Sequence, residues 1–497
     1  MYTLSAQSVK YKLRLWTVAI GSSSALLRAY HKTDRYRLLR IILRAPSGKH
    51  HSYHPVKKFI SNQSSTYTGG LCASKMNSKI TTTLLINVIF IVINLVNENQ
   101  FFVASLERSH AMGSSCDQPI TVEKWGSVNG QNVEKYTLKN KAGQEVDIAT
   151  YGATITSVRT PDKQGNIADI VLGFDDIEGY LSSSNPYFGA TVGRVANRIG
   201  NAQFTLNGKV YHLAKNTGTD TLHGGIKGWN SKVWNATLVE NNVLVLSLLS
   251  EDGDEGFPGA TIATAKFWLT DDGELHVIMT VFTTKPTPIN LTNHSYFNLA
   301  GHKSNAKELY EHVVAINADR WTVTNERSIP TGEIRPVENS IMDLRNLTKL
   351  KDVINKVPGG GYDYNFCLPE TDSVNENKFV AKVSHPASGR YLEVHSNQPG
   401  VQFYTANFLP AQGSTPIHGK DGAEYFKHGA LCLETQNYPD AINHVSIKMQ
   451  YNKFFMLILK FVAEKFSEQC TAARRNLSSF CYIQIWCNKM SKECNFL

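Results

Sequence analysis

Short apolar runs alternate with turn residues along most of this chain. From about residue 118 to residue 444, runs rich in Val, Ile, Thr, Tyr and Phe are separated by Gly, Asn, Asp or Pro. Asn207-Gly208, Asp252-Gly253 and Asp272-Gly273 are dipeptides typical of β-hairpin turns. The pattern predicts closely spaced antiparallel strands, for example at residues 147–151, 243–248, 261–269, 275–282 and 312–316.

Long helical periods and internal repeats are absent from the same stretch. A long series of strands without interleaved helices favours an all-β domain, and its length suits one large antiparallel β-sandwich. We therefore expect a single β-sandwich domain over residues 112–444.

The two ends of the chain differ from this middle. Residues 1–75 are basic and predict a disordered extension, whereas residues 445–497 form a tail with no assignable role. Residues 76–111 contain an apolar run at 84–96. That run is short for a membrane span of about 20 residues but suits the core of a signal peptide.

The start codon decides how this leader acts. Translation from Met76 predicts a secretory signal, and translation from Met1 predicts an anchor that associates with the membrane through residues 80–96. A secreted or membrane-anchored protein is favoured, with a cytoplasmic protein as the alternative. The sequence leaves the oligomeric state open.

The net charge of +9 does not indicate a nucleic-acid partner. Residues 1–79 hold 14 Lys and Arg against one acidic residue, and residues 445–497 hold eight against three. The middle of the chain is therefore acidic. Of the eight cysteines only Cys367 and Cys432 lie between residues 117 and 444, in apolar runs that predict buried, inert thiols.

Two segments far apart in sequence each end a predicted strand with one titratable side chain. The first is Asn-Leu-Thr-Asn-His-Ser-Tyr-Phe-Asn-Leu-Ala-Gly at residues 290–301, which contains His294. The second is Leu-Cys-Leu-Glu-Thr-Gln-Asn-Tyr-Pro-Asp at residues 431–440, which contains Glu434. Burying an unpaired carboxylate among apolar neighbours costs free energy, so the position of Glu434 indicates a functional role. An imidazole and a carboxylate facing one another can move protons without metal or cofactor.

Four further polar residues lie between strand and glycine signals: Arg198, His223, Asp363 and Gln402. Each alone has an ordinary interpretation, such as a surface ion pair or a turn residue. Together they supply the hydrogen-bonding groups that grip several hydroxyls of a neutral sugar, against whose ring Tyr296 and Phe297 could pack. His294 and Glu434 have no third metal ligand at local spacing, and the chain has no nucleophile elbow or phosphate loop.

These segments closely resemble the aldose 1-epimerase (galactose mutarotase) family. The resemblance covers residues 120–444 in the family's order, and the leader resembles that of plant members. It rests on residues 192–199 and 222–225, Asp363 before Asn365-Phe366, and the two segments that hold His294 and Glu434.

The resemblance implies the galactose-mutarotase β-sandwich and interconversion of the α and β anomers of free aldoses without a cofactor. It implies that His294 is the general acid and Glu434 the general base. Asn197, Arg198, His223, Asp363 and Gln402 then bind the substrate, with Tyr296 beside the acid.

Two alternative functions stay open: a hexose-6-phosphate 1-epimerase, which needs more basic residues around its site, and a non-catalytic sugar-binding β-sandwich. The resemblance also stops at residue 444, because the family's closing strand is not recognisable in the tail. We expect this loss to expose a sheet edge close to Glu434.

Overall fold

The computed structural model describes residues 119–240, 242–370 and 377–444, together with strands in segments 18–43 and 454–463. The chain divides into two compact units, Met1–Leu95 and Val96–Leu497. In the first unit β1 (Val18–Ile20), β2 (Ser23–Ala29) and β3 (Leu39–Leu43) pair as an antiparallel sheet. The sequence of β3, Leu-Arg-Ile-Ile-Leu, is rich in the branched apolar residues that favour strands. The predicted leader, 76–111, lies outside the described residues.

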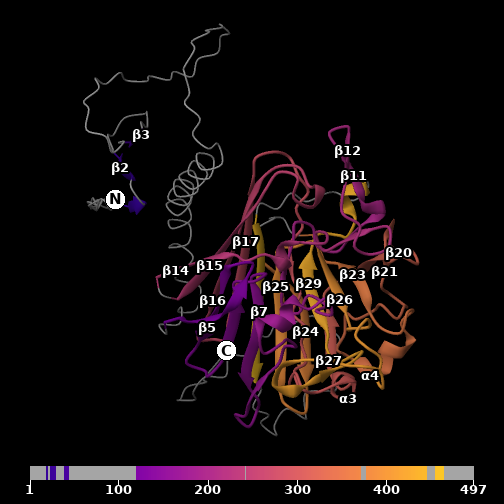
Figure 1. Cartoon of the computed structure of the whole chain (residues 1–497). Helices are drawn as coiled ribbons and strands as arrows, with labels where there is room; N and C mark the ends of the chain where they lie inside the picture. Colours follow the sequence, from indigo (N-terminus) through magenta and orange to yellow (C-terminus); the bar gives the residue numbers. More distant parts are fainter. Residues whose placement is uncertain are drawn as a thin grey trace, which may run out of the picture. The chain divides into compact units, whose positions relative to one another are not determined.

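The second unit is the expected all-β sandwich, built from three main antiparallel sheets (Figure 1). The largest has nine strands in the order β14-β15-β16-β17-β30-β25-β24-β19-β22. Their bounds are β14 (Asn235–Val239), β15 (Val243–Ser250), β16 (Thr261–Leu269), β17 (Glu274–Thr283), β19 (Val313–Ile316), β22 (Thr348–Lys349), β24 (Lys378–His385), β25 (Arg390–Ser396) and β30 (Phe454–Ala463).

Two five-stranded sheets complete the sandwich, one in the order β4 to β8 and one in the order β21-β20-β23-β26-β29. The first comprises β4 (Thr121–Val128), β5 (Gln131–Lys139), β6 (Glu145–Ala149), β7 (Thr154–Pro161) and β8 (Ile167–Asp169). The second comprises β20 (Arg320–Thr324), β21 (Pro330–Pro336), β23 (Asp363–Cys367), β26 (Gly400–Tyr404) and β29 (Cys432–Gln436).

Short strand pairs and helices connect the sheets. The paired strands are β9 (Thr191–Val192) with β18 (Thr292–Asn293), β10 (Arg198–Ile199) with β13 (Thr221–Leu222), β11 (Gln203–Leu206) with β12 (Lys209–His212), and β27 (Ile417–His418) with β28 (Glu424–Tyr425). The α-helices among the described residues are α2 (Ile177–Leu181), α3 (Ala306–Leu309) and α4 (Leu350–Val353). In the described part of the chain, no helix has the length and apolar character needed to cross a membrane.

The strands follow the predicted pattern closely. The expected strand 261–269 is β16, and the expected strand 275–282 lies within β17. The dipeptides Asn207-Gly208 and Asp272-Gly273 turn the chain between β11 and β12 and between β16 and β17. Residues that point inward from all three sheets, among them Val158, Phe267 and Phe403, form one continuous apolar core.

Strand β30 changes the predicted end of the domain. It pairs antiparallel with β17 on one side and with β25 on the other, so residues 454–463 lie in the middle of the nine-stranded sheet. An exposed sheet edge close to Glu434 was expected, because this segment lacks the family's motif. The structure instead places β30 in the nine-stranded sheet, and β29, which carries Glu434, is the end strand of its own five-stranded sheet. The aromatic and branched apolar residues of 454–463 are nevertheless good strand formers. We infer that the domain continues to residue 463.

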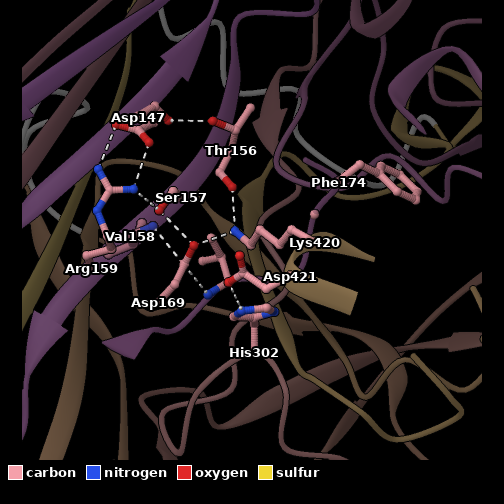
Figure 2. A network of polar contacts seen from close by, with 12 residues as sticks. Asp147, Thr156, Ser157, Val158, Arg159, Asp169, Phe174, His302, Lys420 and Asp421 are labelled. Carbon is pink, nitrogen blue, oxygen red and sulfur yellow. Dashed lines mark hydrogen bonds and ion pairs between the residues drawn. The ribbon is translucent and has the colours of Figure 1, made fainter. Parts of the chain in front are cut away.

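A buried lysine joins the first five-stranded sheet to the loop between β27 and β28 (Figure 2). Lys420 Nζ lies 2.5 Å from Asp169 Oδ2 and donates to the Thr156 carbonyl at 2.6 Å. The Asp169 carboxylate also accepts the Ser157 hydroxyl and the Val158 N–H, and beside it Arg159 binds Asp147 with both terminal nitrogens. Burial lowers the pKa of Lys420, while Asp169 acts in the opposite direction.

Replacing Lys420 with methionine should destabilise the domain by about 3–5 kcal/mol, because the change leaves the Asp169 charge buried without its counter-ion. Urea unfolding followed by circular dichroism measures the difference. Lys303, which is exposed and 3.9 Å from Asp421, offers a matched Lys303→Met control that should cost less than about 0.5 kcal/mol. Equal stabilities for the two variants would contradict this role of Lys420.

Candidate active site

Three neighbouring strands align polar side chains on one face of the second five-stranded sheet. In the antiparallel register Asn365 on β23 is opposite Gln402 on β26, and Gln402 is opposite Glu434 on β29. Asp363 lies two residues before Asn365 and therefore on the same face. The Gln402 amide donates to Asp363 Oδ1 at 2.7 Å. The register thus brings Asp363, Gln402 and Glu434 side by side.

The predicted acid reaches this face from another segment. His294 directly follows β18, and its backbone N–H donates to the Ala190 carbonyl while its own carbonyl accepts the Gly189 N–H. Its Nε2 lies 3.6 Å from Glu434 Oε2. Both residues are buried, with 4% and 2% of their surface exposed. Glu434 Oε2 has no hydrogen-bond partner among the described residues, so it is available to a substrate.

His223 and Asn197 are held in left-handed backbone conformations, with φ of 51° and 62°. Such strain in non-glycine residues persists where the surrounding structure fixes it, often at functional sites. The Asn197 N–H donates to His223 Nδ1 at 3.2 Å. The proton of the neutral His223 ring therefore lies on Nε2. The His223 ring is 5.2 Å from the His294 ring, centroid to centroid, in an edge-on contact.

Arg198 lies at the start of β10 and reaches the sheet face, where its guanidinium is 3.9 Å from Asp363 Oδ2. The two side chains are partly exposed, at 14% and 18%. An ion pair that is this long and partly hydrated leaves donors and acceptors free for hydroxyl groups.

Aromatic rings support the histidines. Tyr296 stacks on His294 with centroids 5.0 Å apart, while its hydroxyl donates to the Pro186 carbonyl. Tyr296 thus supports the His294 ring in the site. Phe297 is buried in the apolar core against Phe461, so the expectation that it packs on a sugar is wrong. Phe297 forms isolated β-bridges with Val171 and Leu431, and its side chain lies in the main apolar cluster.

Two tyrosines of the site were not predicted from the sequence. The Tyr187 ring lies 4.7 Å from that of His223 and 6.1 Å from that of His294. The Tyr404 ring contacts that of His294 edge-on at 6.4 Å. Tyr187 lies in the turn Asn-Pro-Tyr-Phe-Gly, where an aromatic residue beside Pro and Gly looks like an ordinary loop residue. Tyr404 shares a strand and a face with Gln402, a signal that the sequence does contain.

Burial shifts the pKa values of His294 and Glu434 in opposite directions. It lowers the pKa of His294 to about 4. It raises the pKa of Glu434 well above its usual range; the nearby Asp363 raises it further, and Arg198 opposes this. The pKa of His223 is lowered by burial and by the neighbouring His294 and Arg198, which keeps this ring neutral. Together the shifts of His294 and Glu434 favour a proton on Glu434 over a proton on His294.

The structure brings a third potential metal ligand, His223, close to His294 and Glu434, although no such ligand lies near them in sequence. Ligand atoms of His223, His294 and Glu434 lie within 4.8 Å of one another. To ligate a metal through Nε2, His223 needs its proton on Nδ1, where the Asn197 N–H already points. The donor set therefore fits sugar hydroxyls better than a metal ion.

Comparison with known proteins gives consistent matches. The family model for aldose 1-epimerase matches residues 134–453. Galactose mutarotase from Rattus norvegicus is 47% identical over 317 residues, which cover 63% of this chain and 88% of that protein. Aldose 1-epimerase from Escherichia coli (strain K12) is 34% identical over 322 residues, which cover 64% and 89%. The structure of an aldose epimerase homologue from C. elegans aligns over 66% of this chain and 98% of its own, with a TM-score of 0.59 and 26% identity.

A large antiparallel β-sandwich that buries a histidine–glutamate pair beside polar side chains has the architecture and the groups of an acid–base enzyme. The chain belongs to the aldose 1-epimerase family, as its motifs indicated. The eight residues singled out from the sequence lie in one connected site: His294, Glu434, Asn197, Arg198, His223, Tyr296, Asp363 and Gln402.

Proposed function

We propose that this protein is a mutarotase that interconverts the α and β anomers of free aldoses such as glucose and galactose, with His294 and Glu434 as its acid and base. The observation that carries the assignment is their 3.6 Å contact in a buried site. Proton transfer by positioned side chains is all that the reaction needs.

Ring opening moves two protons and breaks one bond. Glu434 takes the proton of the anomeric hydroxyl while His294 gives a proton to the ring oxygen, and the C1–O5 bond breaks to leave an aldehyde. The aldehyde group then turns about the C1–C2 bond. Ring closure reverses the transfers on the other face of the carbonyl, and the two residues exchange roles.

The shifted pKa values favour the arrangement of the proton that ring opening produces, with Glu434 protonated and His294 neutral. With its pKa raised by burial, Glu434 is a stronger base than an exposed carboxylate, whereas protonated His294, with its pKa of about 4, is a strong acid. The pair carries one proton in either direction of the reaction: the proton lies on His294 before the ring opens and on Glu434 before the ring closes.

The other residues hold the sugar hydroxyls. His223 Nε2–H is a fixed donor, Arg198 supplies further donors, and the Asp363 carboxylate accepts. Gln402 donates to Asp363 and has an Oε1 without a hydrogen-bond partner among the described residues, so it offers an acceptor as well. A mixed set of donors and acceptors suits a neutral sugar better than a phosphorylated one.

The decisive experiment follows the optical rotation of fresh α-D-glucose and α-D-galactose after the purified full-length protein is added. Both sugars should reach equilibrium faster than in buffer, and addition of EDTA should not change the rate. A rate increase confined to α-D-glucose 6-phosphate would instead favour the hexose-6-phosphate epimerase. Sugar binding without any rate increase would favour a non-catalytic binding protein.

A further inference from the structure

The segments that carry the acid and the base run antiparallel and are joined at both ends. At one end Phe297 and Leu431 exchange two backbone hydrogen bonds, of 2.7 and 2.9 Å. At the other end a side chain makes the same pair of bonds. The Asn290 Oδ1 accepts the Asn437 N–H at 2.8 Å, and the Asn290 Nδ2 donates to the Asn437 carbonyl at 3.2 Å.

The reacting side chains lie midway between these two joints. His294 is four residues after Asn290 and three before Phe297, while Glu434 is three residues from Leu431 and three from Asn437. The spacing of the two segments at this point decides the distance between the imidazole and the carboxylate. An acid and a base must be held to within a fraction of an ångström for efficient proton transfer.

Asn290 also contacts the segment that leads to the substrate-binding residues. Its backbone N–H donates to the Arg194 carbonyl, and its carbonyl accepts the Ala196 N–H at 2.6 Å. Asn197 and Arg198 follow directly in the chain. Asn290 is buried and lies in the same segment as His294. It is hydrogen-bonded both to the segment that precedes Asn197 and Arg198 and to the segment that contains Glu434.

We propose that Asn290 is a positioning residue that sets the distance between His294 and Glu434, a role that rests on the proposed mutarotase function. Its carboxamide matches a peptide group, with one acceptor and one donor edge, and so replaces a backbone bridge. An aspartate keeps the shape but turns a second oxygen towards the Asn437 carbonyl.

A second asparagine has the same bonding pattern at the binding side of the site. Asn216 Oδ1 accepts the Leu222 N–H at 2.7 Å, and its Nδ2 donates to the Leu222 and Gly225 carbonyls at 2.8 Å. These bonds flank His223. Loss of the Asn216 side chain should therefore affect sugar binding, whereas loss of the Asn290 side chain should affect proton transfer.

A matched structural control is Asn140, which is buried and makes comparable bonds to Gln144, Ala142 and the Thr270 carbonyl. None of these partners is a residue of the proposed site. Its replacement removes a similar set of hydrogen bonds and tests whether loss of stability alone changes the kinetics.

The experiment compares kcat and KM for galactose in Asn290→Ala, Asn216→Ala and Asn140→Ala, each measured at least ten degrees below its own unfolding temperature. Asn290→Ala should lower kcat by about 10- to 100-fold and change KM less than about threefold, since misplacement of about 1 Å has costs of that order. Asn216→Ala should chiefly raise KM, and Asn140→Ala should change neither constant.

Binding of 1,5-anhydro-D-galactitol, which has no anomeric hydroxyl, should be the same for Asn290→Ala and the unmodified protein. A kcat for Asn290→Ala within twofold of the unmodified value, or an equal fall in kcat for Asn140→Ala, would overturn the positioning role. An inactive unmodified protein would instead overturn the mutarotase function. If Asn290→Ala does not fold, Asn290→Ser and Asn290→Asp decide the question by the same criteria.

Discussion

Replacing Glu434 with glutamine should lower kcat for galactose anomerisation by about 10²–10⁴-fold, the usual contribution of a general base. The amide retains the size of the carboxyl group but cannot accept the anomeric hydroxyl proton. Polarimetry gives kcat, and calorimetric titration with 1,5-anhydro-D-galactitol gives the affinity, which should stay within a few-fold of its original value.

The same variant should be at least as stable as the original protein at pH 7. Burial raises the pKa of Glu434 in the folded state, so the folded protein binds more protons than the unfolded chain between the ordinary and the raised pKa. The contribution of Glu434 to the stability therefore falls as the pH rises through that window, and glutamine, which does not titrate, removes this loss.

Glu393→Gln, a change in the partly exposed ion pair with Lys382, is the matched control and should leave kcat unchanged. A near-original rate for Glu434→Gln would refute the assignment of the base.

Replacing His294 with asparagine should also lower kcat by about 10²–10⁴-fold, with a much smaller change in KM, because the acid acts mainly in the transition state. Tyr296 and Tyr187 still flank the position, so the sugar site should keep its shape. Steady-state polarimetry over a range of galactose concentrations separates the two constants.

Two substitutions at the binding residues serve as the comparison for His294. His223→Ala removes a fixed hydrogen-bond donor. Asp363→Asn removes the negative charge that accepts hydrogen bonds from the sugar hydroxyls and pairs with Arg198. Both should chiefly raise KM. If His223→Ala were as inactive as Glu434→Gln at saturating sugar, His223 and not His294 would be the acid.

The strand pattern predicted the fold well because it depends on local chemistry. β16 has the predicted bounds, and the Asn-Gly and Asp-Gly turns lie between paired strands. The sequence motifs also selected His294 and Glu434, which the structure places in contact. Their alignment with Asp363 and Gln402 depends on the register of three strands that are distant in sequence, and no local pattern encodes that register.

Other features escaped prediction for physical reasons. Lys420 lies in a Gly-Lys-Asp-Gly stretch that is typical of an exposed turn, and only the fold brings Asp169 to it. Asn290 looks like one polar residue among several in its motif, since its importance comes from contacts with Asn437 and Ala196. Strand β30 was not predicted because residues 454–463 carry no family motif, and their apolar sequence does not show that they pair with β17 and β25.

The position of β30 has a consequence for synthesis on the ribosome. The strand at the centre of the nine-stranded sheet is the last of its strands to be translated, and β17 and β25, its two neighbours, are made long before it. Until residue 463 has left the exit tunnel, the nascent chain carries two half-sheets whose facing edges have unpaired backbone groups. Such edges recruit chaperones or other chains. All residues of the proposed site are thus made before the strand that completes this sheet.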